Sequence, residues 1–236
     1  MLHRLLPLLD LPFPRSCCSC GAQIREETET GLCWDCRSAS LAIAPPWCEC
    51  CGMVVAGRVD HAFICARCEE HPPVYDRARS LFRYEGGLRD AIHALKYHRD
   101  FSVVPDLARL LWAGIQVHVP EGLAGRALVP VPLHARRLGM RGFNQSLEVL
   151  QALRKLAPGA QIWTGLRRVK DTGTQTRLSA AGRRDNVRGA FAAVSAPESV
   201  LLFDDVMTTG STVDACARAL KKAGSKDVLV MTLARG

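Results

Sequence analysis

Apolar and polar residues alternate along residues 81–236 in a pattern that predicts helices and strands in turn. Mainly apolar runs at residues 81–84, 127–131, 190–194, 200–203 and 227–233 have the length of strands. Helical spacing recurs in further segments: Leu88, Ile92 and Leu95; Leu107, Leu110, Leu111 and Ile115; Leu147, Leu150, Leu153 and Leu156 within 144–156; and residues 212–223, which Gly224 ends. This alternation predicts an α/β fold with a mainly parallel sheet and helices on both faces.

The first third of the chain differs in composition from the rest. Ten of the eleven cysteines lie between Cys17 and Cys68, and the α/β pattern begins only after them. We therefore expect two units, a small cysteine-rich module over residues 1–71 and an α/β domain over residues 72–236. Residues 72–80 are the expected linker between them.

The spacing of the cysteines repeats. Each half of the module has two Cys-x-x-Cys pairs, separated by twelve residues in the first half and by thirteen in the second. Two such pairs supply the four thiolates of a tetrahedral zinc site, so the pattern predicts two structural zinc ribbons. The expected ligands are Cys17, Cys20, Cys33 and Cys36, then Cys48, Cys51, Cys65 and Cys68. Cys18 could replace Cys17, Cys50 could replace Cys48, and the two sets could interleave.

The middle of the chain is strongly basic. Residues 126–188 hold thirteen Lys and Arg against three acidic residues, a net charge of +10, whereas the whole chain carries +8. Such a stretch favours a phosphate-rich partner, either a small polyphosphate or nucleic acid.

No apolar run approaches the roughly 20 residues of a membrane helix, so we expect no membrane insertion. Pro7 and Asp10 interrupt the faintly signal-like start, and we expect a cytoplasmic protein.

The segment 200–212 carries the most specific chemistry. An apolar strand ends at Asp204 and Asp205, and the polar loop Thr208, Thr209, Gly210, Ser211 and Thr212 then opens a helix. Such a loop can direct backbone N–H groups at an anion, while the carboxylates suit a vicinal diol or Mg²⁺. Ribose 5-phosphate has both features. Without a ligand, the adjacent carboxylates should only repel each other. A P-loop ATPase would need Gly-x-x-x-x-Gly-Lys-Ser/Thr, which the chain lacks.

Residues 200–212 resemble the phosphoribosyl-pyrophosphate (PRPP) motif of type I phosphoribosyltransferases. The double zinc ribbon resembles that of the ComF branch of the superfamily. Further segments resemble this branch too, namely residues 95–97, 129–134, Arg137, 141–145, 174–175, Arg184, Asn186 and 189–191. The resemblance implies that Asp204 and Asp205 are the catalytic pair and hold the ribose hydroxyls, that residues 208–212 hold the 5-phosphate, and that Mg²⁺ accompanies PRPP. It also implies a link to natural competence, the import of single-stranded DNA.

Basic residues complete the expected site. The resemblance implies that the turn at residues 132–137 corresponds to the loop that meets pyrophosphate in that superfamily, and we expect Arg137, Arg141 and Lys96 to contact phosphate groups. Residues 170–177 would be the flexible loop that closes over the site. Gly139 occupies a position where members of the superfamily often have a second basic residue. No segment resembles a base-recognition hood, so the sequence does not identify the acceptor substrate.

Three functions compete at this level. The protein could be a phosphoribosyltransferase, or an adaptor that binds PRPP or single-stranded DNA and docks a competence helicase through its ribbons. It could also bind single-stranded DNA directly, although only Phe143 and Trp163 are available for base stacking in the basic stretch.

Overall fold

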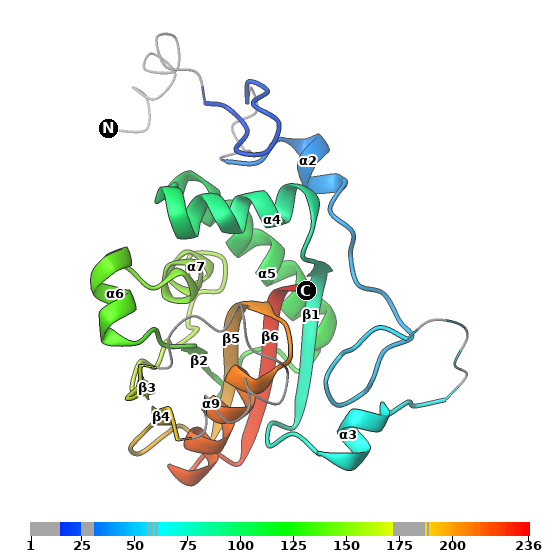
Figure 1. The fold of residues 1–236 in the computed structure, drawn as a ribbon, viewed down its shortest axis with the longest axis vertical. Helices are drawn as coiled ribbons and strands as arrows, with labels where there is room; N and C mark the ends of the chain where they lie inside the picture. The colour runs from blue at the N-terminus through cyan, green and yellow to red at the C-terminus, as the bar shows by residue number, and fades with distance from the viewer. Residues whose placement is uncertain are drawn as a thin grey trace.

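The computed structural model describes residues 15–24, 31–55, 57, 59, 61–171, 187 and 189–236 (Figure 1). The cysteine-rich part contains two short helices, α2 (Trp34–Ser38) and α3 (Ala66–Glu70). The remainder contains β1 (Arg77–Arg83), α4 (Gly86–His93), the π-helical turn η2 (Ala94–His98), the 3₁₀ turn η3 (Phe101–Val103), α5 (Val104–His118), β2 (Ala127–Pro130), α6 (Ala135–Arg141), α7 (Gln145–Leu153), β3 (Arg167–Arg168), β4 (Phe191–Ala192), β5 (Ser199–Met207), α9 (Ser211–Lys222) and β6 (Asp227–Arg235). No helix among the described residues is long and apolar enough to cross a membrane.

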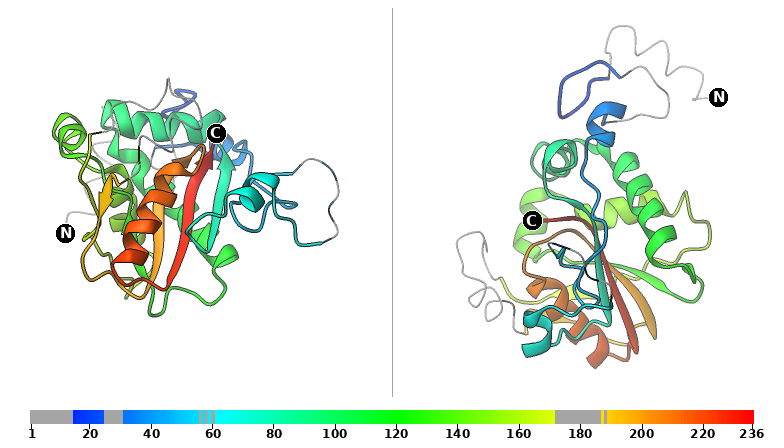
Figure 2. Two further views of the ribbon diagram at one scale, coloured as in Figure 1. Left: turned by 60° about the horizontal axis from the view of Figure 1, so that its bottom comes forward. Right: turned by 90° about the vertical axis from the view of Figure 1, so that its right-hand side faces the viewer.

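Four parallel strands form the central sheet, in the order β1-β6-β5-β2. Successive residues of a strand point to opposite faces, so Leu201 and Phe203 of β5 pack in one core and Val200 and Leu202 in another. Helices α4, α5 and α7 cover the first face, and α9 covers the second (Figures 1 and 2). The predicted α/β fold with helices on both faces is therefore confirmed.

Two predictions about elements were wrong. Strand β1 starts at Arg77, inside the expected linker, because its polar residues are buried with partners. The Ser80 and Thr232 hydroxyls, for example, are hydrogen-bonded at 2.7 Å. Leu156 was expected to point inward but is 39% exposed, because α7 ends at Leu153. The expected flexible loop, residues 170–177, lies outside the described residues from residue 172 onward.

Both ribbons are hydrogen-bonded to the α/β part of the chain. In the first, the N–H groups of Gly31 and Leu32 donate to the buried Asp106 carboxylate of α5 at 2.8 and 3.0 Å. The second lies beside β1, where the Ala78 N–H donates to the Cys50 carbonyl at 2.8 Å. Figures 1 and 2 show these two attachments at separate places on the α/β part. The boundary between residues 71 and 72 stays a prediction.

Candidate functional site

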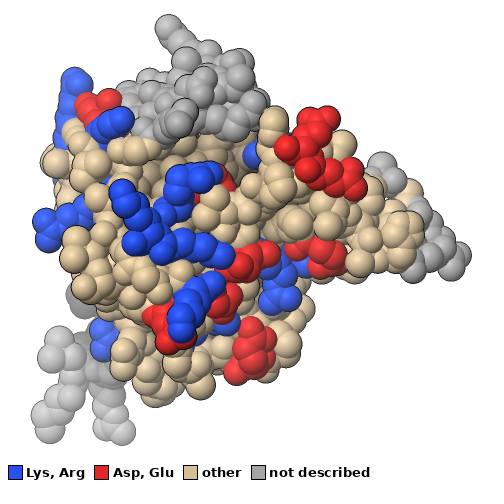
Figure 3. All heavy atoms as spheres, turned by 90° about the horizontal axis from the view of Figure 1, so that it is seen from below, with Lys and Arg blue, Asp and Glu red and all other residues tan. Residues whose placement is uncertain are grey.

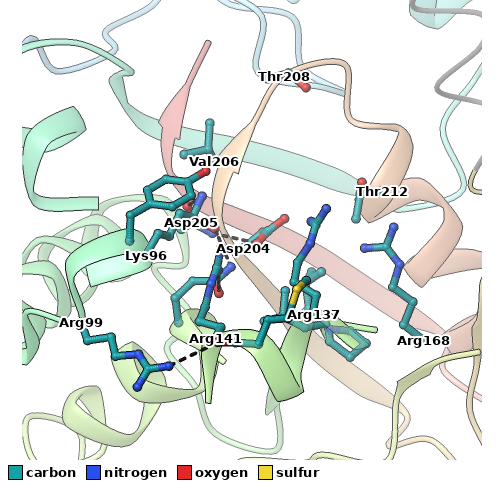
Figure 4. A pocket seen from close by; sticks show the side chains of 16 residues that line it. Lys96, Arg99, Arg137, Arg141, Arg168, Asp204, Asp205, Val206, Thr208 and Thr212 are labelled. Atoms are coloured by element: carbon teal, nitrogen blue, oxygen red, sulfur yellow. Dashed lines mark hydrogen bonds and ion pairs between the residues drawn. The ribbon is translucent and has the colours of Figure 1, made fainter. Parts of the chain in front are cut away.

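A pocket of about 700 Å³ opens at the carboxyl edge of the sheet (Figure 4). Strands β2 and β5 are parallel neighbours, and Pro130 pairs with Phe203, so the segments that follow them emerge side by side. Asp204 and Asp205 come directly after Phe203, and helix α6 follows β2. The site therefore forms where open α/β sheets bind their ligands.

Most of the residues predicted for this site line the pocket. Those that do are Lys96, Arg137, Arg141, Asp204, Asp205, Thr208 and Thr212. Gly210 and Ser211 instead line a second pocket, of about 650 Å³, on the other side of the loop. The Thr209 hydroxyl is hydrogen-bonded to that of Ser211 at 2.9 Å. The loop therefore lies between two pockets, and its first and last residues line the carboxylate pocket.

The two aspartates have different electrostatic surroundings. Lys96 forms an ion pair with Asp205, which also accepts a hydrogen bond from Gln145 Nε2 at 3.1 Å. Burial opposes ionisation of Asp205, but Lys96 outweighs it and lowers the pKa of this carboxyl. Burial and the adjacent charge of Asp205 raise the pKa of Asp204. The expectation that the pair would only repel was wrong, because Lys96 neutralises one member and the other favours its protonated form.

Lys96 reaches Asp205 from an unusual turn of helix. Helix α4 passes into the π-helical turn η2, after which Arg99 adopts a left-handed conformation with φ of 56°. A π-helical turn inserts an extra residue and re-aims the side chains that follow it, and such turns often occur at functional sites. Figure 4 shows Lys96 beside Asp205 and Arg99 at the edge of the pocket. The 3.6-residue spacing of apolar residues, from which the helices were predicted, does not reveal a π-helical turn.

Five basic side chains line the same pocket. Lys96, Arg137 and Arg141 were predicted, whereas Arg99 and Arg168 were missed. Burial lowers the pKa of the Arg141 and Arg168 guanidinium groups, and the nearby Arg137 adds to this effect at both. Arginines nevertheless remain charged. Five cations facing two carboxylates suit a ligand with several negative charges.

The eight predicted cysteines form two compact groups. Sulfur atoms within each group lie within 4.8 Å of one another; the groups are Cys17, Cys20, Cys33 and Cys36, and Cys48, Cys51, Cys65 and Cys68. Representative S···S separations are 3.7 Å for Cys20–Cys33 and 3.9 Å for Cys51–Cys65. Tetrahedral zinc with Zn–S bonds of about 2.3 Å places its sulfurs roughly 3.8 Å apart. The donor sets fit zinc and suggest two structural zinc ions.

The grouping favours one of the alternatives left open by the spacing. Cys18 and Cys50 lie outside both groups, and each group draws its ligands from one ribbon without interleaving. Burial raises the pKa of Cys18 to about 12, which keeps its thiol protonated. Burial also opposes ionisation of Cys17 and Cys48, but backbone N–H groups outweigh it and lower both pKa values to about 7. The thiolate is the form that binds metal.

Fold and site together define a double zinc ribbon protein with a basic pocket in its α/β part. Residues 8–70 match the double zinc ribbon domain family. The chain is 33% identical to competence protein F of Haemophilus influenzae over 219 residues, which cover 88% of this chain and 91% of that protein. It is 34% identical to DNA utilization protein YhgH of Escherichia coli strain K12, covering 88% and 98%. Competence protein ComFC of Streptococcus pneumoniae is 27% identical, covering 66% and 67%. The chain belongs to the competence protein F family.

Proposed function

We propose that this protein binds PRPP together with Mg²⁺ and that it supports DNA uptake. The names of its relatives, competence proteins and DNA utilization proteins, support the second part. The observation that carries the first part is the pairing of Asp204 and Asp205 with five cations at the carboxyl edge of one sheet.

In this proposal each group of PRPP has a suitable partner in the pocket. The carboxylates at residues 204 and 205 suit the ribose diol, and the side of the 208–212 loop that Thr208 and Thr212 line suits the 5-phosphate. Arg137, Arg141 and Arg168 would contact the pyrophosphate. Without these cations, the two carboxylates would repel its negative charge. Mg²⁺ would neutralise the pyrophosphate further when bound. Lys96 would share Asp205 with the sugar hydroxyls.

The chemistry that this arrangement suits is phosphoribosyl transfer. The bond between the ribose C1 and pyrophosphate breaks, a nucleophilic acceptor bonds to C1, and pyrophosphate departs. Basic side chains stabilise the leaving charge, and the carboxylates orient the ribose and suit the positive charge that develops on it. The acceptor substrate is not identified, so the test is to incubate the protein with PRPP, Mg²⁺ and candidate bases in turn and to measure the release of pyrophosphate.

A second candidate is an adaptor that binds PRPP or single-stranded DNA and docks a competence helicase. It is favoured by exposed apolar side chains on the cysteine-rich part: Trp34, Leu41, Met53 and Ile64. Direct binding of DNA by the basic stretch has less support, because Phe143, one of its two aromatic residues, is buried and does not offer its ring to a base. On the face shown in Figure 3, acidic and basic side chains are interspersed. The adaptor would bind PRPP without releasing pyrophosphate.

Calorimetric titration with PRPP tests the first candidate and the form of the adaptor that recognises PRPP. Replacing both aspartates, with Asp204→Asn and Asp205→Asn, should weaken binding at pH 9, where both are ionised, roughly 10²- to 10⁴-fold, at about 1.5–3 kcal/mol for each charge-assisted hydrogen bond. Asp35→Asn, an exposed carboxylate on α2, is the matched control. Undetectable binding by the unmodified protein at millimolar PRPP would reject the proposal.

A further inference from the structure

The second ribbon touches the loop that we assign to the 5-phosphate. Arg67 lies on α3 between the ligands Cys65 and Cys68, and its guanidinium donates a hydrogen bond to the carbonyl of Thr209. Arg67 Nη2 would also lie 3.9 Å from a Cβ atom placed at Gly210. A residue of the zinc module is thus part of the surroundings of a loop more than a hundred residues later.

The ribbon that carries Arg67 is fixed to the sheet. Arg235, at the end of β6, donates to the Cys51 carbonyl at 2.8 Å, and Arg79 of β1 donates to the Glu49 carbonyl at 2.9 Å. Beyond α3, the Val74 N–H donates to the Asp214 carboxylate of α9 at 2.6 Å. These bonds hold the ribbon against the same strands and helix that flank the loop.

The contact has a geometric consequence for the loop. A trans peptide is planar, and its N–H points away from its C=O. When the Thr209 carbonyl faces Arg67, the Gly210 N–H of the same peptide points the opposite way, away from the ribbon. The side of the loop opposite the second pocket is the carboxylate pocket, which Thr208 and Thr212 line. Fixing this carbonyl therefore turns the Gly210 N–H towards the side of the loop that Thr208 and Thr212 line.

We propose that Arg67 is a positioning residue through which the second zinc ribbon orients the peptide between Thr209 and Gly210 for anion binding. Zinc in that ribbon is thereby coupled to phosphate affinity, since α3 begins at one zinc ligand and contains another. The affinity part of this inference rests on the proposed function. The ordering of the loop does not.

The test compares Arg67→Ala with Arg37→Ala. Both remove an arginine from a ribbon helix, but Arg37 stacks on Trp34 within its own ribbon, 5.0 Å from the ring centre. Arg67 is exposed, so its loss leaves the core intact. In Arg67→Ala we expect both zinc ions to remain, and PRPP affinity to fall on the order of tenfold, since the hydrogen bond is charge-assisted but open to solvent. Arg37→Ala should change neither, and Arg67→Lys should regain part of the affinity.

A measurement without ligand separates this proposal from the previous one. The heteronuclear NOE of the Gly210 amide, recorded by NMR on the zinc-loaded protein, should drop in Arg67→Ala and stay unchanged in Arg37→Ala. An unchanged NOE in Arg67→Ala would overturn the positioning role, as would loss of zinc from that variant. If the unmodified protein binds no PRPP, the proposed function fails, and the NOE still decides whether Arg67 orders the loop.

Discussion

The neighbouring residues Asp204 and Asp205 both lie in the second half of β5, but their pKa values are shifted in opposite directions. Lys96 keeps Asp205 ionised, while burial and the charge of Asp205 raise the pKa of Asp204 to about 8. A carboxyl that is protonated near neutral pH donates a hydrogen bond, whereas an ionised one only accepts. Near pH 7 the pair therefore offers the two sugar hydroxyls one acceptor and one donor.

Affinity for PRPP should rise between pH 7 and pH 9, because Asp204 ionises in this range and then accepts a charge-assisted hydrogen bond. Phosphate groups are already largely dianionic above pH 7 and contribute little to the change. Calorimetric titrations at several pH values measure it. Asp204→Asn should flatten the profile, and an equally steep profile in that variant would assign the titration to another group.

The same shift predicts the stability of the unliganded protein. Because the folded-state pKa of Asp204 is raised, the folded state binds more protons than the unfolded state from about pH 4 to pH 8. The contribution of Asp204 to the free energy of unfolding is present below this window and is lost as pH rises through it. Urea denaturation of Asp204→Asn should show a smaller decline with pH than the unmodified protein.

Asp205→Asn should behave differently from Asp204→Asn. It leaves the Lys96 ammonium, whose side chain is 17% exposed, without its ion partner. We expect the free energy of unfolding to fall by roughly 2–4 kcal/mol, somewhat below the cost of breaking a fully buried pair. Urea denaturation with zinc present measures it. Combining Lys96→Met with Asp205→Asn should recover much of the loss, and strict additivity of the two changes would contradict a direct pair.

At the scale of the element, the loop between β5 and α9 depends on one glycine. Gly210 has φ of +75° and caps α9, in a conformation that costs other residues about 1–2 kcal/mol. Gly210→Ala should therefore shift the loop and weaken PRPP binding about tenfold while both zinc ions remain. Gly139→Ala in α6 is the control, because open space surrounds that position. Calorimetry and elemental analysis report the two outcomes.

Elements were predictable where local pattern and environment agree. Strand β5, its aspartates and helix α9 follow one another in the sequence, and the structure keeps them together. Strand β1 was placed too late because Arg79 and Ser80 are buried by partners from distant segments, Glu49 and Thr232. Arg168 was missed because its strand has two residues and no period. Long-range partners, which a linear pattern does not encode, account for these differences.

For the whole molecule, the metal content is the first quantity to measure. Elemental analysis should find two zinc ions per chain, since each group of four cysteines has the S···S separations of a tetrahedral site. Cys33→Ser should lower the content to about one and reduce thermal stability, whereas Cys18→Ser should change neither. Loss of zinc from Cys18→Ser would mean that Cys18, rather than Cys17, is a ligand.

The segments that flank the edge strands of the sheet affect how the protein self-associates when its metal is removed. The outer side of β1 is occupied, because Ile43 donates to the Leu81 carbonyl, Arg83 donates to the Leu41 carbonyl, and Ala78 donates to Cys50. Residue 162 bridges to β2 on the opposite border. An unpaired border strand recruits strands from other molecules. Chelation that released the ribbon segments would free only β1, so metal-depleted protein should pair edge to edge as a dimer through β1, because β2 stays shielded and no larger assembly can form.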